Sequence, residues 1–181
     1  MKFTFTVFVN IILNMNQYEE EVISTLKKLG IVFSLKEHAE MVSMDEYETI
    51  EKELSCMVPK NLFLCNQQHT KFYLLLMPGN KKFKTKGLSK QINSARLSFA
   101  SDDELDEDMH CFKGSTSVFG LLFDKKNNVQ LLIDEDLLNN EYLGFHPCVN
   151  TMTIRIKKKD LIDVFLPYVS HEFIKVKLIG D

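Results

Sequence analysis

The feature that most constrains the fold is a polar turn, GFHPCVNT at residues 144–151, which leads directly into an alternating run, TMTIRIK at 151–157. Alternation of apolar and polar residues is typical of a half-buried β-strand. Loops that enter a strand of a rigid scaffold often present functional side chains. This turn offers an imidazole, a thiol, a carboxamide and a hydroxyl, so we expect it to form part of a functional site.

The rest of the chain predicts helices interspersed with strands. Capping boxes mark two helix starts, Ser43 with Glu46 and Ser101 with Glu104. The pattern predicts helices at 16–29, 43–54, 101–109, 135–141 and 159–166, and strands at 31–38, 57–65, 71–77, 129–134 and 151–157, the second and third strands forming a hairpin. This order predicts an α+β (mixed α/β) fold whose central, mixed and largely antiparallel sheet is flanked by helices.

Length and composition indicate one globular domain. The chain has 181 residues, 45% of them hydrophobic, and a net charge of −3, so an RNA partner would require a local basic patch. Four scattered cysteines without a CxxC pair are typical of reduced thiols in a cytoplasmic protein. Residues 1–14 are too short to span a bilayer and lack a small-x-small cleavage site. We interpret them as an extension, with a strand as the alternative, ahead of a domain at 15–181.

A basic segment lies between residues 81 and 96, where six basic residues occur without an acidic one. Such a segment is commonly a solvated surface. The alternative is a patch that contacts the phosphates of a nucleic acid. If the second interpretation is correct, the residues that contact the nucleic acid are Lys81, Lys82, Lys84, Lys86, Lys90 and Arg96.

The familiar catalytic patterns are absent from the sequence. The histidines show no HxxxH or HExxH spacing and no cysteine pair joins them, so we expect no metal. On an extended segment, Cys148 and His146 would point the same way and could form a dyad, although a cysteine beside an apolar strand is usually packing. Neither Ser115 nor Ser117 lies in a G-x-S-x-G elbow. Lysine, asparagine, histidine and a glycine-rich loop remain, which suit the binding and polarisation of an ester.

Four motifs together carry a specific resemblance. They are PKNLFL at 59–64, RLSFAS at 96–101, KGSTSVFGL at 113–121 and GFHPCVNT at 144–151. In this order and spacing they resemble the YbaK/prolyl-tRNA-synthetase-associated domain family, and within it the free-standing ProX-type editing proteins. The resemblance covers Met15 to about Ser170 and supports the interpretation of residues 1–14 as an extension.

The resemblance implies an activity. Such a protein hydrolyses mischarged Ala-tRNA(Pro) in trans to prolyl-tRNA synthetase, without a metal or another cofactor. A synthetase pocket built for proline cannot strongly exclude the smaller alanine, so a second site must remove the error. Deacylation of Cys-tRNA(Pro) or another small-residue ester is the near alternative. A non-catalytic module that binds tRNA or the synthetase is the alternative from a different class.

The resemblance also implies roles for single residues. Lys60 would contact the 3′ end of the tRNA near the ester, and Asn61 would position the substrate beside it. His146 would line the pocket, and Asn150 would support it. The family is thought to use the 2′-hydroxyl of the terminal adenosine to help activate water.

The glycine-rich loop would offer backbone amides to the aminoacyl group. Its residues are Gly114, Ser115, Thr116, Ser117 and Val118. The family loop commonly reads Gly-x-x-x-Pro, and Val118 stands where the proline falls. Valine keeps an apolar contact but loses the fixed φ of proline, which affects loop rigidity and hence selectivity among small amino acids.

Overall fold

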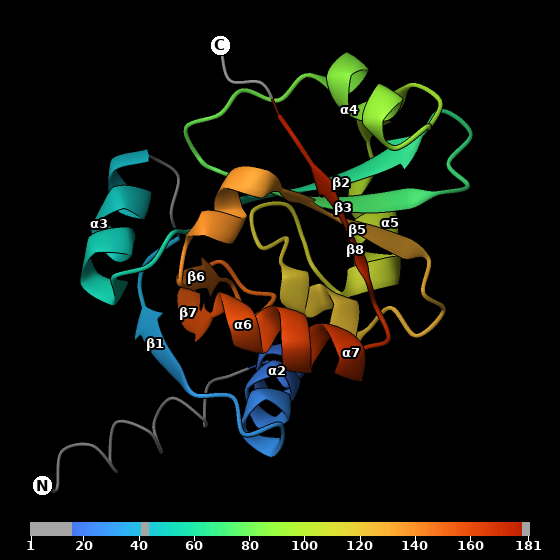
Figure 1. The fold of residues 1–181 in the computed structure, drawn as a ribbon. Coiled ribbons are helices and arrows are strands. Elements are labelled where there is room, and N and C mark those ends of the chain that lie inside the picture. The colour runs from blue at the N-terminus through green and yellow to red at the C-terminus, as the bar shows by residue number, and fades with distance from the viewer. Residues whose placement is uncertain (1–15, 41–43, 179–181) are drawn as a thin grey trace, which may run out of the picture.

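The computed structural model describes residues 16–40 and 44–178 of the chain (Figure 1). Its helices are α2 (Gln17–Lys28), α3 (Met44–Leu54), α4 (Thr85–Gln91), α5 (Asp102–Met109), α6 (Lys158–Asp160) and α7 (Leu166–Tyr168), with 3-10 turns at Val118–Leu122 and Glu135–Asn139 and a π-helical turn at Leu161–Phe165. Its strands are β1 (Phe33–Glu37), β2 (Lys60–Asn66), β3 (Phe72–Met77), β4 (Leu97–Phe99), β5 (Val129–Asp134), β6 (Tyr142–Phe145), β7 (Met152–Lys157) and β8 (Phe173–Val176).

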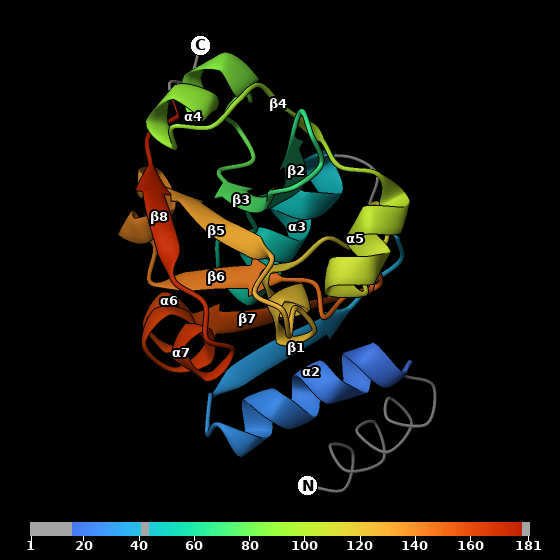
Figure 2. The same cartoon turned by 90° about the vertical axis from the view of Figure 1, so that its right-hand side faces the viewer.

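The strands form two sheets. One has the order β4-β2-β3-β5-β8, with β2 antiparallel to β3 and β4, and with β5 parallel to β3 and β8. The other has the order β1-β7-β6, and both of its pairings are antiparallel. In Figure 2 the strands of the two sheets follow one another down the molecule, and α2 lies below β1. The mixed α/β class and the predominance of antiparallel pairs are confirmed, although the strands divide into two sheets.

The five-stranded sheet is buried on both faces, which explains its long apolar strands. Alternate residues of β3 enter different cores: Leu74 and Leu76 join the main cluster, which also contains α2, whereas Leu75 and Met77 join a smaller cluster. Helix α4 contributes Leu88 to the smaller cluster. A strand with this two-sided burial reads as a continuous apolar run in the sequence.

Side-chain caps begin two of the described helices, and the cap at α5 is one that the sequence predicts. The side chain of Asn16 accepts hydrogen bonds from the N–H groups of Tyr18 and Glu19 at the start of α2. At α5, the side chains of Ser101 and Glu104 form the predicted reciprocal capping box. The cap expected at Ser43 lies outside the described residues, as does the extension at 1–14.

Several elements were not predicted. Helix α4 was hidden in the lysine-rich segment, and the short strands β4, β6 and β8 follow turns that obscure their alternation. The predicted helix at 135–141 is a 3-10 turn followed by β6, and the predicted glycine-rich loop at 114–118 leads into a second 3-10 turn. Strand β6 matters most, because it pairs with β7 across the polar turn and fixes where that turn begins. Within the described ranges, no helix combines the length and hydrophobicity needed to cross a bilayer.

Candidate active site

A pocket of about 370 Å³ brings together five segments that are distant in the sequence. Its walls come from α3, the start of β2, the turn after β3, the loop that contains Gly114, and the end of β6. This volume is near the lower end of the range for small-molecule sites, so the pocket suits a small ligand group. The predicted site residues that line it are Lys60, Asn61, Gly114, Thr116 and His146.

Strand β2 supplies the first two of these residues. Lys60 is exposed at the start of the strand, and Asn61 pairs with Leu76 of β3. The Nδ2 of Asn61 donates to the carbonyl of Pro59 at 2.9 Å. A carbonyl can only accept, so this bond fixes the amide and leaves Oδ1 as the acceptor. Oδ1 is buried and has no hydrogen-bond partner among the described residues.

His146 follows β6 and is 7% exposed. Its Nδ1 lies 2.7 Å from the carbonyl of Met152, which assigns the proton to Nδ1 and leaves Nε2 as an acceptor in the neutral ring. Burial lowers the pKa of His146, and the neighbouring His38 acts in the same direction, against the opposing effect of the Met152 bond. The ring is therefore neutral at physiological pH.

Gly114 adopts φ +95°, a left-handed conformation that side chains rarely tolerate. This conformation turns the chain so that Gly114 and Thr116 face the pocket. Asn150 lies against the same loop. A Cβ atom built on Gly114 would be 3.8 Å from the Nδ2 of Asn150. Asn150 is not among the described residues that line the pocket.

The other three side chains of the loop serve its own structure. Ser115 closes a turn by bonding both the N–H and the carbonyl of Phe112, at 2.9 and 3.0 Å. Ser117 caps the following 3-10 turn by accepting from the N–H of Phe119. Val118 is fully buried in the main core, so the apolar contact expected at the usual proline position is present. The side chains of these three residues are therefore supports of the loop and do not line the pocket.

The structure does not pair Cys148 with His146. Cys148 has φ +61°, so the segment is not extended as the dyad required. Its thiol shares a hydrogen bond with Cys111, which together with burial raises its pKa well above the ordinary value. The Nδ1 of His146 is bonded to Met152. The dyad considered from the sequence is therefore wrong.

The basic segment divides into residues of different kinds. Lys81 is 13% exposed, and its ammonium lies 2.7 Å from both Asp134 and Asp136. It also donates to the carbonyl of Leu178 at 3.0 Å. Lys81 therefore connects the loop after β3 to the ends of β5 and β8, and this position does not favour the tRNA contact predicted for it.

The remaining basic residues stay candidates for tRNA contact. Lys86 and Lys90 lie on α4, and Arg96 immediately precedes β4. Because Gly79 and Asn80 line the pocket, the basic segment starts at the pocket rim. Its position therefore suits a chain of phosphates that leads away from the pocket.

The fold and the pocket define a class of protein, a mixed α/β domain with a small-ligand site at the start of a central strand. Residues 38–164 match the model of the aminoacyl-tRNA editing domain. The chain therefore belongs to the aminoacyl-tRNA editing domain family, as its four motifs predict.

Named relatives agree with this membership. The chain is 33% identical over 143 residues to the prolyl-tRNA editing protein ProX of Acetoanaerobium sticklandii, with 79% of this chain and 87% of that protein covered. It is 26% identical to the prolyl-tRNA synthetase associated domain-containing protein 1 of Danio rerio, with 81% and 79% covered. A crystal structure provisionally assigned as a trans-editing enzyme for prolyl tRNA synthetase superposes with a TM-score of 0.68 at 15% identity, covering 93% of this chain and all of that one. At this identity the superposition shows the shared fold.

Proposed function

We propose that this chain is a trans-editing deacylase that hydrolyses the ester between tRNA(Pro) and a wrongly attached small amino acid, with alanine as the preferred substrate. Its similarity to ProX over 79% of its length supports this activity. The observation that carries the assignment is the convergence of Lys60, Asn61, Gly114 and His146 on one small pocket. The setting is the cytoplasm, where prolyl-tRNA synthetase produces the mischarged tRNA.

The pocket provides what an aminoacyl ester needs for recognition. The substrate carries an α-ammonium group, and the Oδ1 of Asn61, which no described residue hydrogen-bonds, is a buried acceptor for one of its protons. A neutral His146 does not repel that ammonium group, and its Nε2 is a second acceptor. Lys60 is exposed at the mouth, where an ammonium can contact the phosphates of the tRNA 3′ end.

Hydrolysis requires an attack by water on the ester carbonyl. The bond between this carbon and the ribose oxygen breaks, and the leaving oxygen takes up a proton that water releases. Backbone amides of the loop at Gly114 would stabilise the oxyanion. The 2′-hydroxyl of the terminal adenosine would help to orient the water. The products are the free amino acid and tRNA(Pro).

Selectivity comes from size. A pocket of about 370 Å³ also takes the ribose end of the tRNA, so the space left for the acyl side chain is small. Alanine fits such a space more easily than proline does. The pocket would therefore act as a second, size-selective site that hydrolyses only esters of amino acids small enough to enter. Cysteine is intermediate in size, so Cys-tRNA(Pro) is the competitor that the pocket has to discriminate.

A deacylation panel tests this function. Ala-, Cys-, Ser- and Pro-tRNA(Pro) would be incubated with the protein, with and without a chelator, and the remaining ester measured over time. We expect Ala-tRNA(Pro) to be cleaved fastest and Pro-tRNA(Pro) to survive. Lys60→Ala should abolish the cleavage while the protein stays folded, and Lys71→Ala, at the opposite end of the β2–β3 hairpin, is the matched control. Binding of tRNA without cleavage of any ester would identify a non-catalytic module instead.

A further inference from the structure

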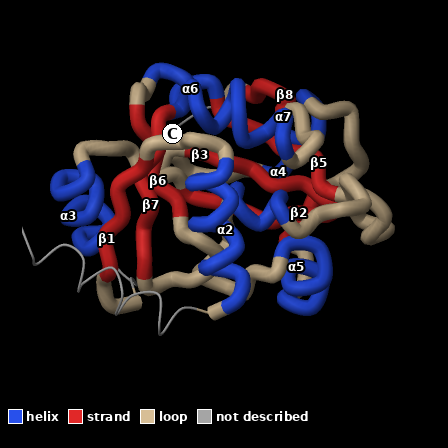
Figure 3. The backbone as a smooth tube through the Cα atoms, turned by 90° about the horizontal axis from the view of Figure 1, so that it is seen from below, coloured by secondary structure: helices blue, strands red, loops and turns tan. Residues whose placement is uncertain are grey.

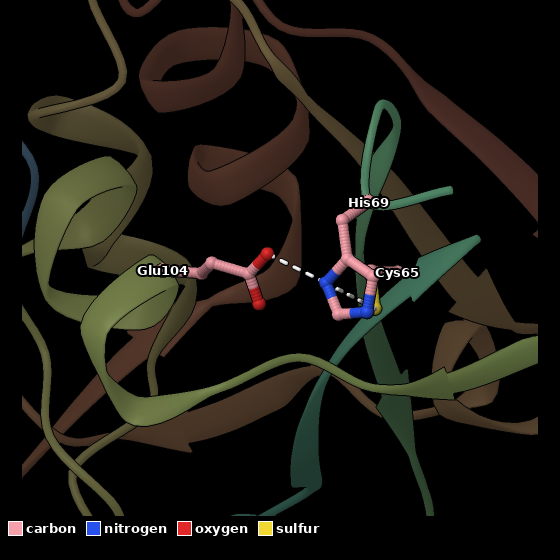
Figure 4. Close-up of side chains that lie close together, drawn as sticks. All are labelled: Cys65, His69 and Glu104. Carbon is pink, nitrogen blue, oxygen red and sulfur yellow. Dashed lines mark hydrogen bonds and ion pairs between the residues drawn. The ribbon is translucent and has the colours of Figure 1, made fainter. Parts of the chain in front are cut away.

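Three side chains with metal-binding atoms meet at the far end of the β2–β3 hairpin. Cys65 is near the end of β2, His69 lies in the turn, and Glu104 comes from the first turn of α5 (Figure 4). The Nδ1 of His69 is 2.7 Å from Oε1 of Glu104 and 3.6 Å from the Cys65 sulfur. The three ligand atoms lie within 4.8 Å of one another.

These distances fit a tetrahedral zinc ion. With Zn–S near 2.3 Å and Zn–N and Zn–O near 2.0–2.1 Å, tetrahedral ligands are about 3.5 Å apart for sulfur and nitrogen, and about 3.3 Å apart for nitrogen and oxygen. The first value matches the Cys65–His69 separation of 3.6 Å. The second requires the 2.7 Å bond between His69 and Glu104 to open by about half an ångström, which a side-chain adjustment can provide.

The positions of the ligands are held by the surrounding structure. His69 has φ +53° and donates its N–H to the carbonyl of Asn66, whose side chain in turn accepts from the N–H of Thr70. The two oxygens of Glu104 have different partners. Oε2 accepts from the N–H of Ser101 at 2.8 Å, and Oε1 faces the cluster, 2.7 Å from the Nδ1 of His69.

The cluster is also open to solvent on one side. The Cys65 sulfur is buried, whereas the side chains of His69 and Glu104 are 51% and 22% exposed. An ion can thus reach the thiol past the imidazole and the carboxylate, and a water molecule can complete its coordination.

We propose that Cys65, His69 and Glu104 bind one zinc ion, with water as the fourth ligand. A thiol, an imidazole and a carboxylate form a ligand set that suits zinc among the common divalent ions. Binding converts the Cys65 thiol to a thiolate, and its proton is released to solvent, so the affinity rises with pH. The ion would fasten the hairpin turn to α5.

This site is separate from the pocket. None of its three residues lines the pocket, which lies at the start of β2 and against α3. Figures 1 and 3 show α3 and α5 on opposite sides of the molecule. The ion would therefore stabilise the fold, and a chelator should leave the chemistry in the pocket unaffected. The Cys-x3-His spacing was visible in the sequence, but Glu104 is 35 residues further on and joins it only through the fold.

Cobalt and zinc titrations of the full chain test the site. With the thiols kept reduced, Co²⁺ bound by the thiolate gives a charge-transfer band in the near ultraviolet and tetrahedral d–d bands in the visible range. We expect these bands to saturate at one equivalent and to disappear when one equivalent of zinc is added. Zinc should also raise the midpoint of thermal unfolding, since it binds the folded state.

Matched variants assign the ligands. His69→Asn keeps a residue that tolerates the left-handed backbone, and His110→Asn is its control, because His110 also has a positive φ of 46° and also lies near an acid, Asp106. Glu104→Gln keeps the capping box, and Glu107→Gln on the same helix is its control. Loss of a ligand should weaken binding at least about 100-fold, since loss of an outer-shell partner already weakens it about 10–100-fold.

Two results would overturn the site. One is a wild-type protein without thiolate–cobalt bands at several equivalents of metal. The other is a set of bands that His69→Asn and Glu104→Gln leave unchanged, or that the two controls reduce equally. Both readouts are independent of deacylation, so failure of this site and failure of the editing activity can be told apart.

Discussion

The side-chain amide of Asn61 donates to the carbonyl of Pro59 at 2.9 Å, and its oxygen is a buried acceptor that receives no hydrogen bond from the part of the chain that the structure describes. A buried polar atom without a partner normally destabilises a protein. In a pocket wall it is complementary to a ligand that brings a donor. Under the proposed function, we expect that donor to be the α-ammonium group that every aminoacyl ester carries.

Asn61→Leu tests this role by replacing the amide with an apolar group of similar size. We expect kcat/KM for Ala-tRNA(Pro) to fall about 10- to 150-fold, since a hydrogen bond to a charged group is worth about 1.5–3 kcal/mol. The free energy of unfolding should change by less than about 1 kcal/mol, because the lost bond to Pro59 is offset by removal of the unpaired oxygen. Activity that stays at the wild-type level would show that the oxygen does not contact the substrate.

Much of this site could be predicted because its parts are contiguous motifs. Lys60 with Asn61, the loop at Gly114, and the turn that contains His146 each lie within a few residues in the sequence. Pairings over long distances could not be predicted. In the sequence Lys81 was one of six basic residues, and no neighbouring residue indicated its partner Asp134, 53 positions away. Only the packing of β5 beside β3 makes that partner visible.

Gly114→Ala separates backbone strain from catalysis. A Cβ atom at this position would make only an ordinary van der Waals contact, with the Nδ2 of Asn150 at 3.8 Å. The destabilisation should therefore come from the φ of +95° and amount to about 1–3 kcal/mol. Gly30→Ala is the control, because Gly30 has φ +68° and no atom of the described residues lies within 4 Å of its Cβ position. We expect similar shifts in urea denaturation midpoints for both variants but a loss of deacylation for Gly114→Ala alone. Equal activity in the two variants would remove the loop from the mechanism.

Lys81 and the helix α4 lysines should respond differently to substitution. Lys81→Met leaves the fully buried Asp134 without its cation and should lower the free energy of unfolding by about 3–5 kcal/mol. Lys86→Ala and Lys90→Ala should leave stability nearly unchanged. If they contact phosphates, each reduces the slope of log K for tRNA against log salt by about 0.9. Slopes equal to that of the wild type would assign these lysines to ordinary solvated surface.

The buried pair of Asp124 and His171 determines how the fold responds to acid. The His171 Nε2 lies 3.1 Å from Oδ2 of Asp124, and both side chains are 1% exposed. Burial acts to raise the pKa of Asp124, but the bond from His171 and the N–H groups of Asn128 and Val129 outweigh it and lower the pKa. A carboxyl whose pKa is lower in the folded state contributes stability above its unfolded value of about 3.9, and this contribution is lost as pH falls through the folded value.

Asp124→Asn should therefore destabilise the protein at pH 7 by about 3–5 kcal/mol, because it removes one partner of a buried pair. Below about pH 4 the difference in the free energy of unfolding between the variant and the wild type should become smaller, because protonation of Asp124 then removes its stabilising contribution from the wild type. Urea denaturation at a series of pH values measures both effects. Asp163→Asn is the control, because its pair with Lys159 is exposed and should contribute no more than about 1 kcal/mol. A destabilisation by Asp124→Asn that stays constant across the acid range would mean that hydrogen-bond geometry, and not ionisation, is what the pair supplies.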